Sequence, residues 1–129
     1  MSDPALTVRV AKPFEEVVPL VKEALKTQGF GVLTEIDMRA TMQAKLGEEI
    51  EDYVILGACN PPLAFQALSA DRRVGLLLPC NVVVRASDGE TVVEAVDPRM
   101  MLADAAYQGM GPVADDAAGK LGAALATLA

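Results

Sequence analysis

The chain has 129 residues, a length at which a single domain over residues 1–129 buries about two thirds of its unfolded surface. Apolar residues make up 52% of the composition and aromatic residues only 4%, so the core must be aliphatic. The net charge of -7 opposes contact with nucleic acid and with anionic membranes. Histidine is absent, which excludes Ser-His-Asp and Cys-His nucleophiles and histidine-held zinc.

Hydropathy and the first residues bear on partners and location. The mean hydropathy of +0.31 is high for a soluble monomer, so we expect a homodimer. No apolar run approaches the roughly 20 residues of a membrane span. The opening MSDPALT has neither the basic flank nor the apolar core of a signal peptide. We therefore expect a cytoplasmic protein with two reduced thiols.

The first part of the chain alternates strand and helix patterns. Polar and apolar residues alternate from Ala5 to Val10, which predicts a half-buried strand. A helix follows from Pro13 to Gly29, either kinked at Pro19 or beginning near it. The next elements are predicted as a strand over 30–34, a helix over 36–46, a solvated acidic connector with Glu48, Glu49, Glu51 and Asp52, and a strand over 53–58.

The second part contains two cysteines beside turn-forming residues. Asn60 is a suitable helix N-cap and Pro61 suits the first helical position, so a helix should run to about Ser69. Residues 74–78 and 82–85 predict a fourth strand interrupted at Pro79. An Asp-Gly pair predicts a tight hairpin to a fifth strand over 91–96. An apolar segment of undetermined structure (Met100, Met101, Leu102, Ala105, Ala106) and a last helix from Pro112 follow.

This order, β-α-β-α-β-α-β-β-α, predicts an α+β (mixed α/β) fold. The architecture should be a two-layer sandwich, with a four- to five-stranded sheet covered by helices. The strands over 53–58 and 74–85 are apolar enough to lie at the centre of the sheet.

The candidate site lies at two Cys-Asn pairs, Cys59-Asn60 and Cys80-Asn81. A helix beginning at Asn60 would place Cys59 beside free backbone N–H groups, which either lower the pKa of a thiol or bind an anion. If the two central strands are parallel neighbours, the helix between them would bring both thiols to one end of the sheet. Glu35 and Asp37 could serve as general bases if they converge on Cys59.

Several interpretations of these residues remain open. The two thiols could be inert core residues, because free cysteine is often buried. They could instead carry thiol or redox chemistry, with Cys59 as nucleophile and Cys80 as resolving partner, or hold a metal together. Two thiolates are too few for structural zinc, so no metal site is predicted. The methionines, Met38 and Met42 among them, are expected to fill gaps in the core.

Four segments together form a family signature: GFGVLTEID at 29–37, ILGACNP at 55–61 followed by Ala64, GLLLPCNVVV at 75–84 and VDP at 96–98. They resemble the domain-of-unknown-function 302 family over most of the chain, from Val8 to the last helix. The resemblance implies a compact, dimeric α/β domain of uncharacterised function and assigns no substrate or cofactor. Its motif falls on Cys59, Asn60, Pro61, Pro79 and Cys80.

The sequence thus predicts binding of a small ligand or anion, with Cys59, Asn60, Pro61, Cys80, Asn81 and Glu35 as candidate binding residues. The alternatives are a thiol-based redox, sulfur-handling or metal-binding protein and a structural dimeric interaction module. No cofactor is identified, and catalysis is left open, with Cys59 and Cys80 as the candidate thiols.

Overall fold

Five strands and the helices between them follow the predicted order in the computed structural model, which describes residues 5–102 and 109–129. The fold class is confirmed as α+β, with one five-stranded sheet and packing helices. The elements are β1 (Ala5–Val10), α1 (Phe14–Thr27), β2 (Gly31–Asp37), α2 (Met38–Leu46), β3 (Tyr53–Cys59), α3 (Pro61–Ala70), the 3-10 helix η1 (Arg72–Leu77), β4 (Cys80–Ser87), β5 (Glu90–Val96), α4 (Pro98–Met101) and α5 (Gly111–Ala126).

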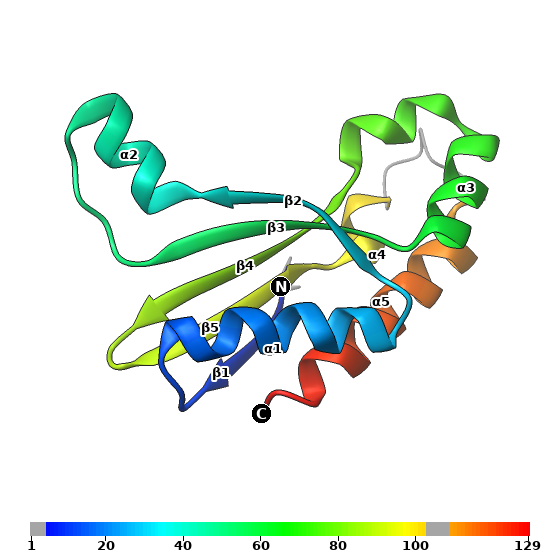
Figure 1. The fold of residues 1–129 in the computed structure, drawn as a ribbon. Coiled ribbons are helices and arrows are strands. Elements are labelled where there is room, and N and C mark those ends of the chain that lie inside the picture. Colours follow the sequence, from blue (N-terminus) through cyan, green and yellow to red (C-terminus); the bar gives the residue numbers. More distant parts are fainter. Residues whose placement is uncertain (1–4, 103–108) are drawn as a thin grey trace.

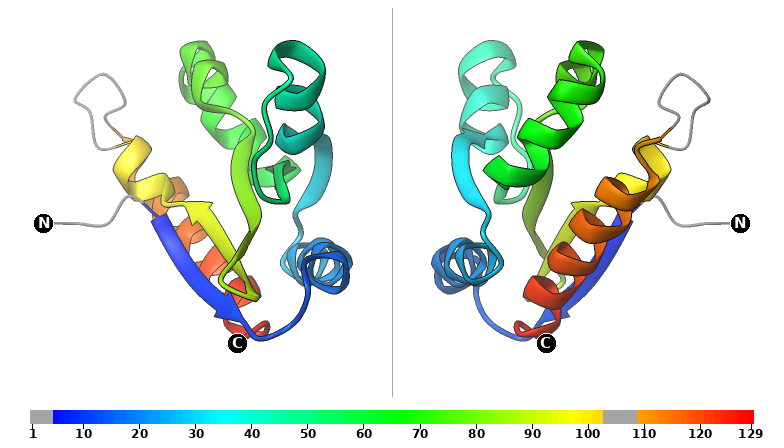
Figure 2. Two further views of the ribbon diagram at one scale, coloured as in Figure 1. Left: turned by 90° about the vertical axis from the view of Figure 1, so that its left-hand side faces the viewer. Right: turned by 90° about the vertical axis from the view of Figure 1, so that its right-hand side faces the viewer.

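The sheet has the strand order β1-β5-β4-β3-β2, and each neighbouring pair is antiparallel. Helices α1 and α5 pack on one face, where an aliphatic core forms, as the composition predicts. Figure 1 shows α2 and α3 at opposite ends of the molecule, both away from α1. In both views of Figure 2 the two helices are at the end far from the C-terminus, one in front of the other. The core includes Val17, Val21, Leu25, Val54, Leu56, Val82, Val84, Val93, Leu121 and Leu125.

Helix α1 begins where the sequence places it. Pro13 is extended at the N-cap, and Glu15 and Glu16 lie in the first turn, where the helix dipole favours acidic residues. The helix contains Pro19, so the alternative in which it begins near that proline is wrong. Gly29 follows the helix with a φ of 83°, a conformation that favours glycine.

The boundary between β2 and α2 differs from the prediction. Ile36 belongs to the strand, which pairs with β3 as far as Asp37. The Asp37 side chain then accepts a hydrogen bond of 2.9 Å from the Ala40 N–H and caps α2. The local cap therefore places the helix start two residues later than the apolar spacing predicts.

The predicted strand over 74–78 is wrong, because this segment lies largely in η1. The Asp71 side chain accepts a hydrogen bond of 2.9 Å from the Arg73 N–H and starts this helix. Strand β4 begins only at Cys80 and runs antiparallel to β3, so the parallel arrangement considered from the sequence is also wrong. Helices α3 and η1 return the chain to the end of the sheet that it has just left.

The hairpin and the last helix agree with the sequence prediction. Asp88 and Gly89 both have positive φ in the tight turn that joins β4 to β5. The last helix begins at Gly111, one residue before the predicted start. Part of the apolar segment after β5 forms α4, while Ala105 and Ala106 lie outside the described residues. Within residues 5–102 and 109–129, no helix combines the length and apolar character needed to cross a membrane.

Candidate functional site

Asn60 joins the end of α1 to the start of α3. Its side-chain oxygen accepts a hydrogen bond of 3.3 Å from the Leu63 N–H, so it caps α3 as predicted. Its side-chain nitrogen donates to the Gln28 carbonyl at 3.2 Å. Asn60 is only 7% exposed, and a Cβ on Gly29 would lie 3.0 Å from its side-chain nitrogen. The amide therefore fixes the turn between β3 and α3.

The first turn of α3 has no spare hydrogen-bond donors over residues 61–64, all of which the structure describes. Pro61 and Pro62 have no N–H group. The Leu63 N–H is used by the Asn60 side chain, and the Ala64 N–H donates to the Asn60 carbonyl at 2.9 Å. An anion here would lack the backbone donors that usually bind anions at helix N-termini.

The two thiols lie at the same end of the sheet. Cys80 is paired with Ala58 across β3 and β4, and Cys59 is the next residue along β3. Cys80 is buried, whereas Cys59 is partly exposed. Burial raises the pKa of the Cys80 thiol to about 11, and the neighbouring Cys59 thiol contributes to the rise. Cys80 is therefore protonated at neutral pH.

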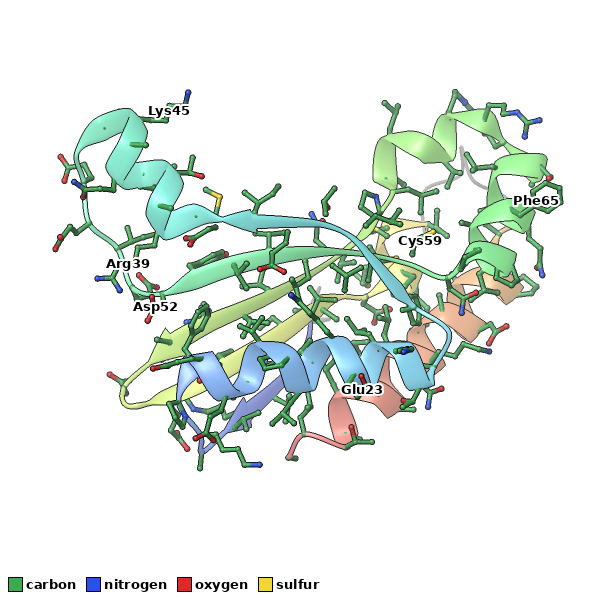
Figure 3. The ribbon with its side chains drawn as sticks, in the orientation of Figure 1. Glu23, Arg39, Lys45, Asp52, Cys59 and Phe65 are labelled. Carbon is green, nitrogen blue, oxygen red and sulfur yellow. The ribbon has the colours of Figure 1, made fainter. Side chains whose placement is uncertain are left out.

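Both thiols line a cavity of about 40 Å³ that lies among the ends of the central strands, α3, η1, α4 and α5. Figure 3 shows Cys59 on the inner side of α3, with Phe65 on the opposite side. Of the described residues that line the cavity, none is charged. The lining is Phe30, Ala58, Cys59, Asn60, Leu63, Ala64, Ala67, Val74, Leu77, Leu78, Cys80, Pro98, Met101, Leu102, Val113, Ala114 and Ala117.

The other predicted binding residues do not share the cavity lining. Pro61 and Asn81 are exposed, and Asn81 lies opposite Gly57 in the register of β3 and β4. Glu35 forms an ion pair with Lys22 of α1 on the surface. Asp37 is paired with Val54, at the far end of β3 from Cys59, so the two carboxylates do not converge on the thiol.

Sequence reasoning missed most of the lining because it comes from distant segments. Phe30 follows α1, Met101 belongs to α4, and Ala114 lies on α5. One signal was present in the sequence: the alanines of the last helix allow close packing, and two of them, Ala114 and Ala117, face this cavity. Which neighbour they would meet depends on the sheet topology.

The acidic connector does not form a metal centre in the described parts of the chain. There, no group of three or more Cys, Asp or Glu side chains is placed to hold a metal ion. Asp52, at the end of this connector, accepts a hydrogen bond of 3.0 Å from Arg39 on α2. The pair ties the connector to the helix before it.

A five-stranded antiparallel sheet, packed against two helices and closed at one end over an apolar cavity, places the chain among the small two-layer α+β domains. Residues 6–128 match the family described as "Domain of unknown function DUF302", and the chain belongs to this family. It is similar to the crystal structure of the uncharacterized conserved protein DUF302 from Bacillus stearothermophilus, with a TM-score of 0.92 and 30% identity. That similarity covers 99% of this chain and 100% of the other chain. No curated protein matches the chain.

Proposed function

We propose that the protein binds a small apolar ligand in the cavity beneath α3, with Cys59 at the ligand. The observation that supports this is the lining itself, which comes from several elements and contains no charged side chain among the described residues. A concave, mostly apolar site with a few polar groups is the usual form of a small-molecule site. The two thiols supply those groups here, since Asn60 uses its amide to hold the fold.

Two features favour an apolar ligand over an anion. The prolines and the Asn60 cap leave residues 61–64 without a spare N–H group, as described above. A negative charge in the cavity would also lose its hydration without gaining a charged partner, because none of the described lining residues is charged. A neutral aliphatic group meets neither obstacle and gains dispersion contacts with the lining.

The cavity volume limits the size of this ligand. About 40 Å³ exceeds the roughly 10–15 Å³ that one water needs, but a water also needs two to four polar partners. Leu63, Val74 and Val113 supply none through their side chains. A short alkyl group, alone or as the end of a longer molecule, therefore suits the space.

A matched pair of probes tests this proposal. 1-Butanol and butyrate share a short alkyl chain but differ in charge, and NMR can follow the methyl signals of Leu63, Val74 and Val113 during titration. We expect 1-butanol to shift these signals at lower concentration than butyrate does. Equal or stronger binding of butyrate, or no shift of the lining methyl groups with 1-butanol, contradicts the proposal.

Variants that fill the cavity locate the binding. Ala64→Leu adds volume at a partly exposed lining position, and Ala114→Leu does so from α5. Both should abolish the 1-butanol shifts. Ala123→Leu places the same side chain on an exposed position of α5 and should leave binding unchanged. Binding that survives in folded Ala64→Leu and Ala114→Leu proteins would assign the ligand to another site.

A second candidate function is thiol exchange, which the shared position of the two thiols favours. The Cys59 thiolate would attack a low-molecular-weight disulfide, forming a mixed disulfide and releasing one thiolate. The Cys80 thiol would then lose its proton, attack the Cys59 sulfur and release the second thiolate. Because the pKa of Cys80 is about 11, the second step would be slow at neutral pH. The reduced thiols that this requires fit a cytoplasmic protein.

Labelling and mass spectrometry test the second candidate. Native protein treated with glutathione disulfide should gain one glutathione at Cys59 and then lose it as the Cys59–Cys80 disulfide forms. Iodoacetamide should label Cys59 in the native protein and Cys80 only after unfolding, since only Cys59 is partly exposed. If neither thiol of the native protein reacts with either reagent, thiol exchange is excluded.

A further inference from the structure

The edge strand β2 pairs with β3 along its length and leads to α2 and an acidic loop, which project from one end of the molecule. We call residues 31–52 the arm. Neither β2 nor α2, both within the described residues, has a buried side chain. A nine-residue helix is marginal in water on its own, and most helices in proteins depend on packing of an apolar face. The arm instead exposes Ile36 and Leu46 near its projecting end, with Leu46 68% exposed. Leu33 is also exposed, but it lies near the start of β2, beside the end of β3.

A second apolar surface lies at the opposite end, on α3 and η1, which we call the corner (residues 61–77). Its inner side closes the cavity with Leu63, Ala67 and Val74. Its outer side exposes Phe65 and Leu76, which are 73% and 83% exposed. Figure 3 shows Phe65 pointing away from the body of the molecule. The corner therefore presents large apolar side chains that residues 5–102 and 109–129 leave exposed.

The two surfaces carry opposite charge. The arm has six acidic side chains and two basic ones, and four of the acidic residues lie in the loop after Leu46. The corner has one acidic side chain, Asp71, and two basic ones, Arg72 and Arg73. Arg73 forms an ion pair with Asp71 at 2.8 Å, so the corner has a net charge of +1, from two basic side chains less one acidic one. These basic residues lie within four positions of Leu76 in the sequence. Apolar surfaces flanked by opposite charges favour contact with each other, and the charges fix their orientation.

We propose that the arm of one molecule packs against the corner of a second copy of the same chain. In the view of Figure 1, the arm's α2 and the corner's α3 lie at opposite ends and both away from α1. A second copy turned by 180° about an axis perpendicular to that view brings its corner to the first arm. The same rotation brings its arm to the first corner. The two contacts form a closed two-fold dimer.

A second copy is the occupant that these observations favour. Both surfaces expose apolar side chains, and their net charges have opposite sign. One chain carries both surfaces. An unrelated partner would need to match only one of them and would leave the other exposed. This inference is independent of the ligand proposed for the cavity, because it concerns the outer side of α3.

Sedimentation analysis of the purified chain tests the dimer. We expect a mass of twice 13.5 kDa at micromolar concentration. Leu46→Lys puts a positive charge opposite the basic corner, and Leu76→Glu puts a negative charge opposite the acidic arm. Each substitution affects both contacts of a two-fold dimer, so each should raise the dissociation constant at least tenfold. Leu20→Lys, at an exposed position of α1 outside both surfaces, should leave it unchanged.

Mixing the two variants gives the sharper test. In a mixed dimer, the lysine introduced into the arm of the first variant would face the glutamate introduced into the corner of the second. The other contact of that dimer keeps both native leucines. We therefore expect the mixture to dimerise although each variant alone is monomeric.

Other arrangements give different results in these experiments. An arm-to-arm or corner-to-corner dimer would gain nothing from mixing. A native protein that is monomeric at all concentrations, a dimer that survives either substitution, or a mixture that stays monomeric overturns the proposal.

Discussion

At both ends of the molecule a side-chain cap begins a helix, but only one of the two helices packs into the body of the protein. At each end an Asx side chain caps the helix that follows a strand: Asp37 is the last residue of β2, and Asn60 directly follows β3. Helix α3 then packs Leu63 and Ala67 into the body of the protein, whereas α2 buries no side chain within its own chain. Local capping thus determines where a helix begins, while packing determines whether the chain alone can hold it.

This difference separates two kinds of function. At the end with α3, the inner side of the helix packs into the body and lines a site with two thiols, while Phe65 on the outer side stays exposed. The end with α2 leaves its apolar side chains in water and offers a surface. Substitutions that disturb the end with α3 should therefore cost more stability than equivalent changes at the arm.

The largest effect is expected at Gly57 on β3. A Cβ there would lie 2.2 Å from the Thr34 hydroxyl oxygen and 2.7 Å from Cγ of Pro79, closer than real side chains approach. Because Pro79 cannot move aside by rotation, Gly57→Ala should lower the free energy of unfolding by about 3 kcal/mol. Urea unfolding at pH 7 measures the loss.

The matched control is Gly31→Ala on β2, where a Cβ would meet no atom within 4 Å. We expect a change of no more than about 0.5 kcal/mol. Thr34→Ala in the Gly57→Ala background should recover part of the loss, because it removes one of the two close contacts. Equal losses for the two glycine variants would show that backbone effects, rather than the contacts with Thr34 and Pro79, dominate.

The sequence predicts the elements that depend on local chemistry well, and it predicts the segment between α3 and β4 wrongly. The Asp-Gly turn, the Asn60 cap and the strand over 53–58 depend on local chemistry, and the structure has each of them. The strand predicted over residues 74–78 was wrong because an apolar run of five residues suits a buried strand and a short helix equally well. The Asp71 side chain caps η1 and thereby favours the helix. The apolar pattern alone gives no weight to that polar residue.

The candidate site was predictable only in part. The two Cys-Asn pairs indicate the end of the sheet at which the cavity lies, since both cysteines line it. The sequence does not reveal that two successive prolines and the Asn60 cap remove the free N–H groups an anion needs, until the cap geometry is known. Nor does it place Phe30 or Ala114 at the site, because their positions depend on long-range packing.

The pH dependence of stability tests the burial of Cys80. Its pKa is about 11 in the folded protein against 9.0 for a free thiol, so the folded state holds this proton more tightly. The stabilisation is complete below pH 9 and is lost as the pH rises to about 11. Because the two pKa values differ by about two units, we expect the free energy of unfolding to fall by about 2–3 kcal/mol over this range. Urea unfolding of the native protein and of Cys80→Ala between pH 7 and 11, under reducing conditions, isolates this contribution as the difference.

Burial is the larger cause of this shift and Cys59 the smaller, so the pH dependence should persist in a Cys59→Ala background. If it disappears there, charge repulsion between the thiols dominates and Cys80 is less shielded than its position in β4 implies. A difference between native protein and Cys80→Ala that stays constant from pH 7 to 11 would contradict the burial itself.

Substitutions at the two helix caps compare the two ends of the molecule most directly. They include the smallest of the stability losses predicted for a structural contact. Asn60→Ala removes a buried cap and leaves the Gln28 carbonyl without its partner, so we expect a loss of about 2 kcal/mol. Asp37→Ala removes an exposed cap, where water replaces the lost hydrogen bond, and should cost about 0.5–1 kcal/mol. Both values follow from urea unfolding at pH 7. Equal losses would indicate that the arm is held as firmly as the corner. In that case α2 would have support beyond its own chain, and the loss for Asp37→Ala should fall once Leu46→Lys separates the dimer.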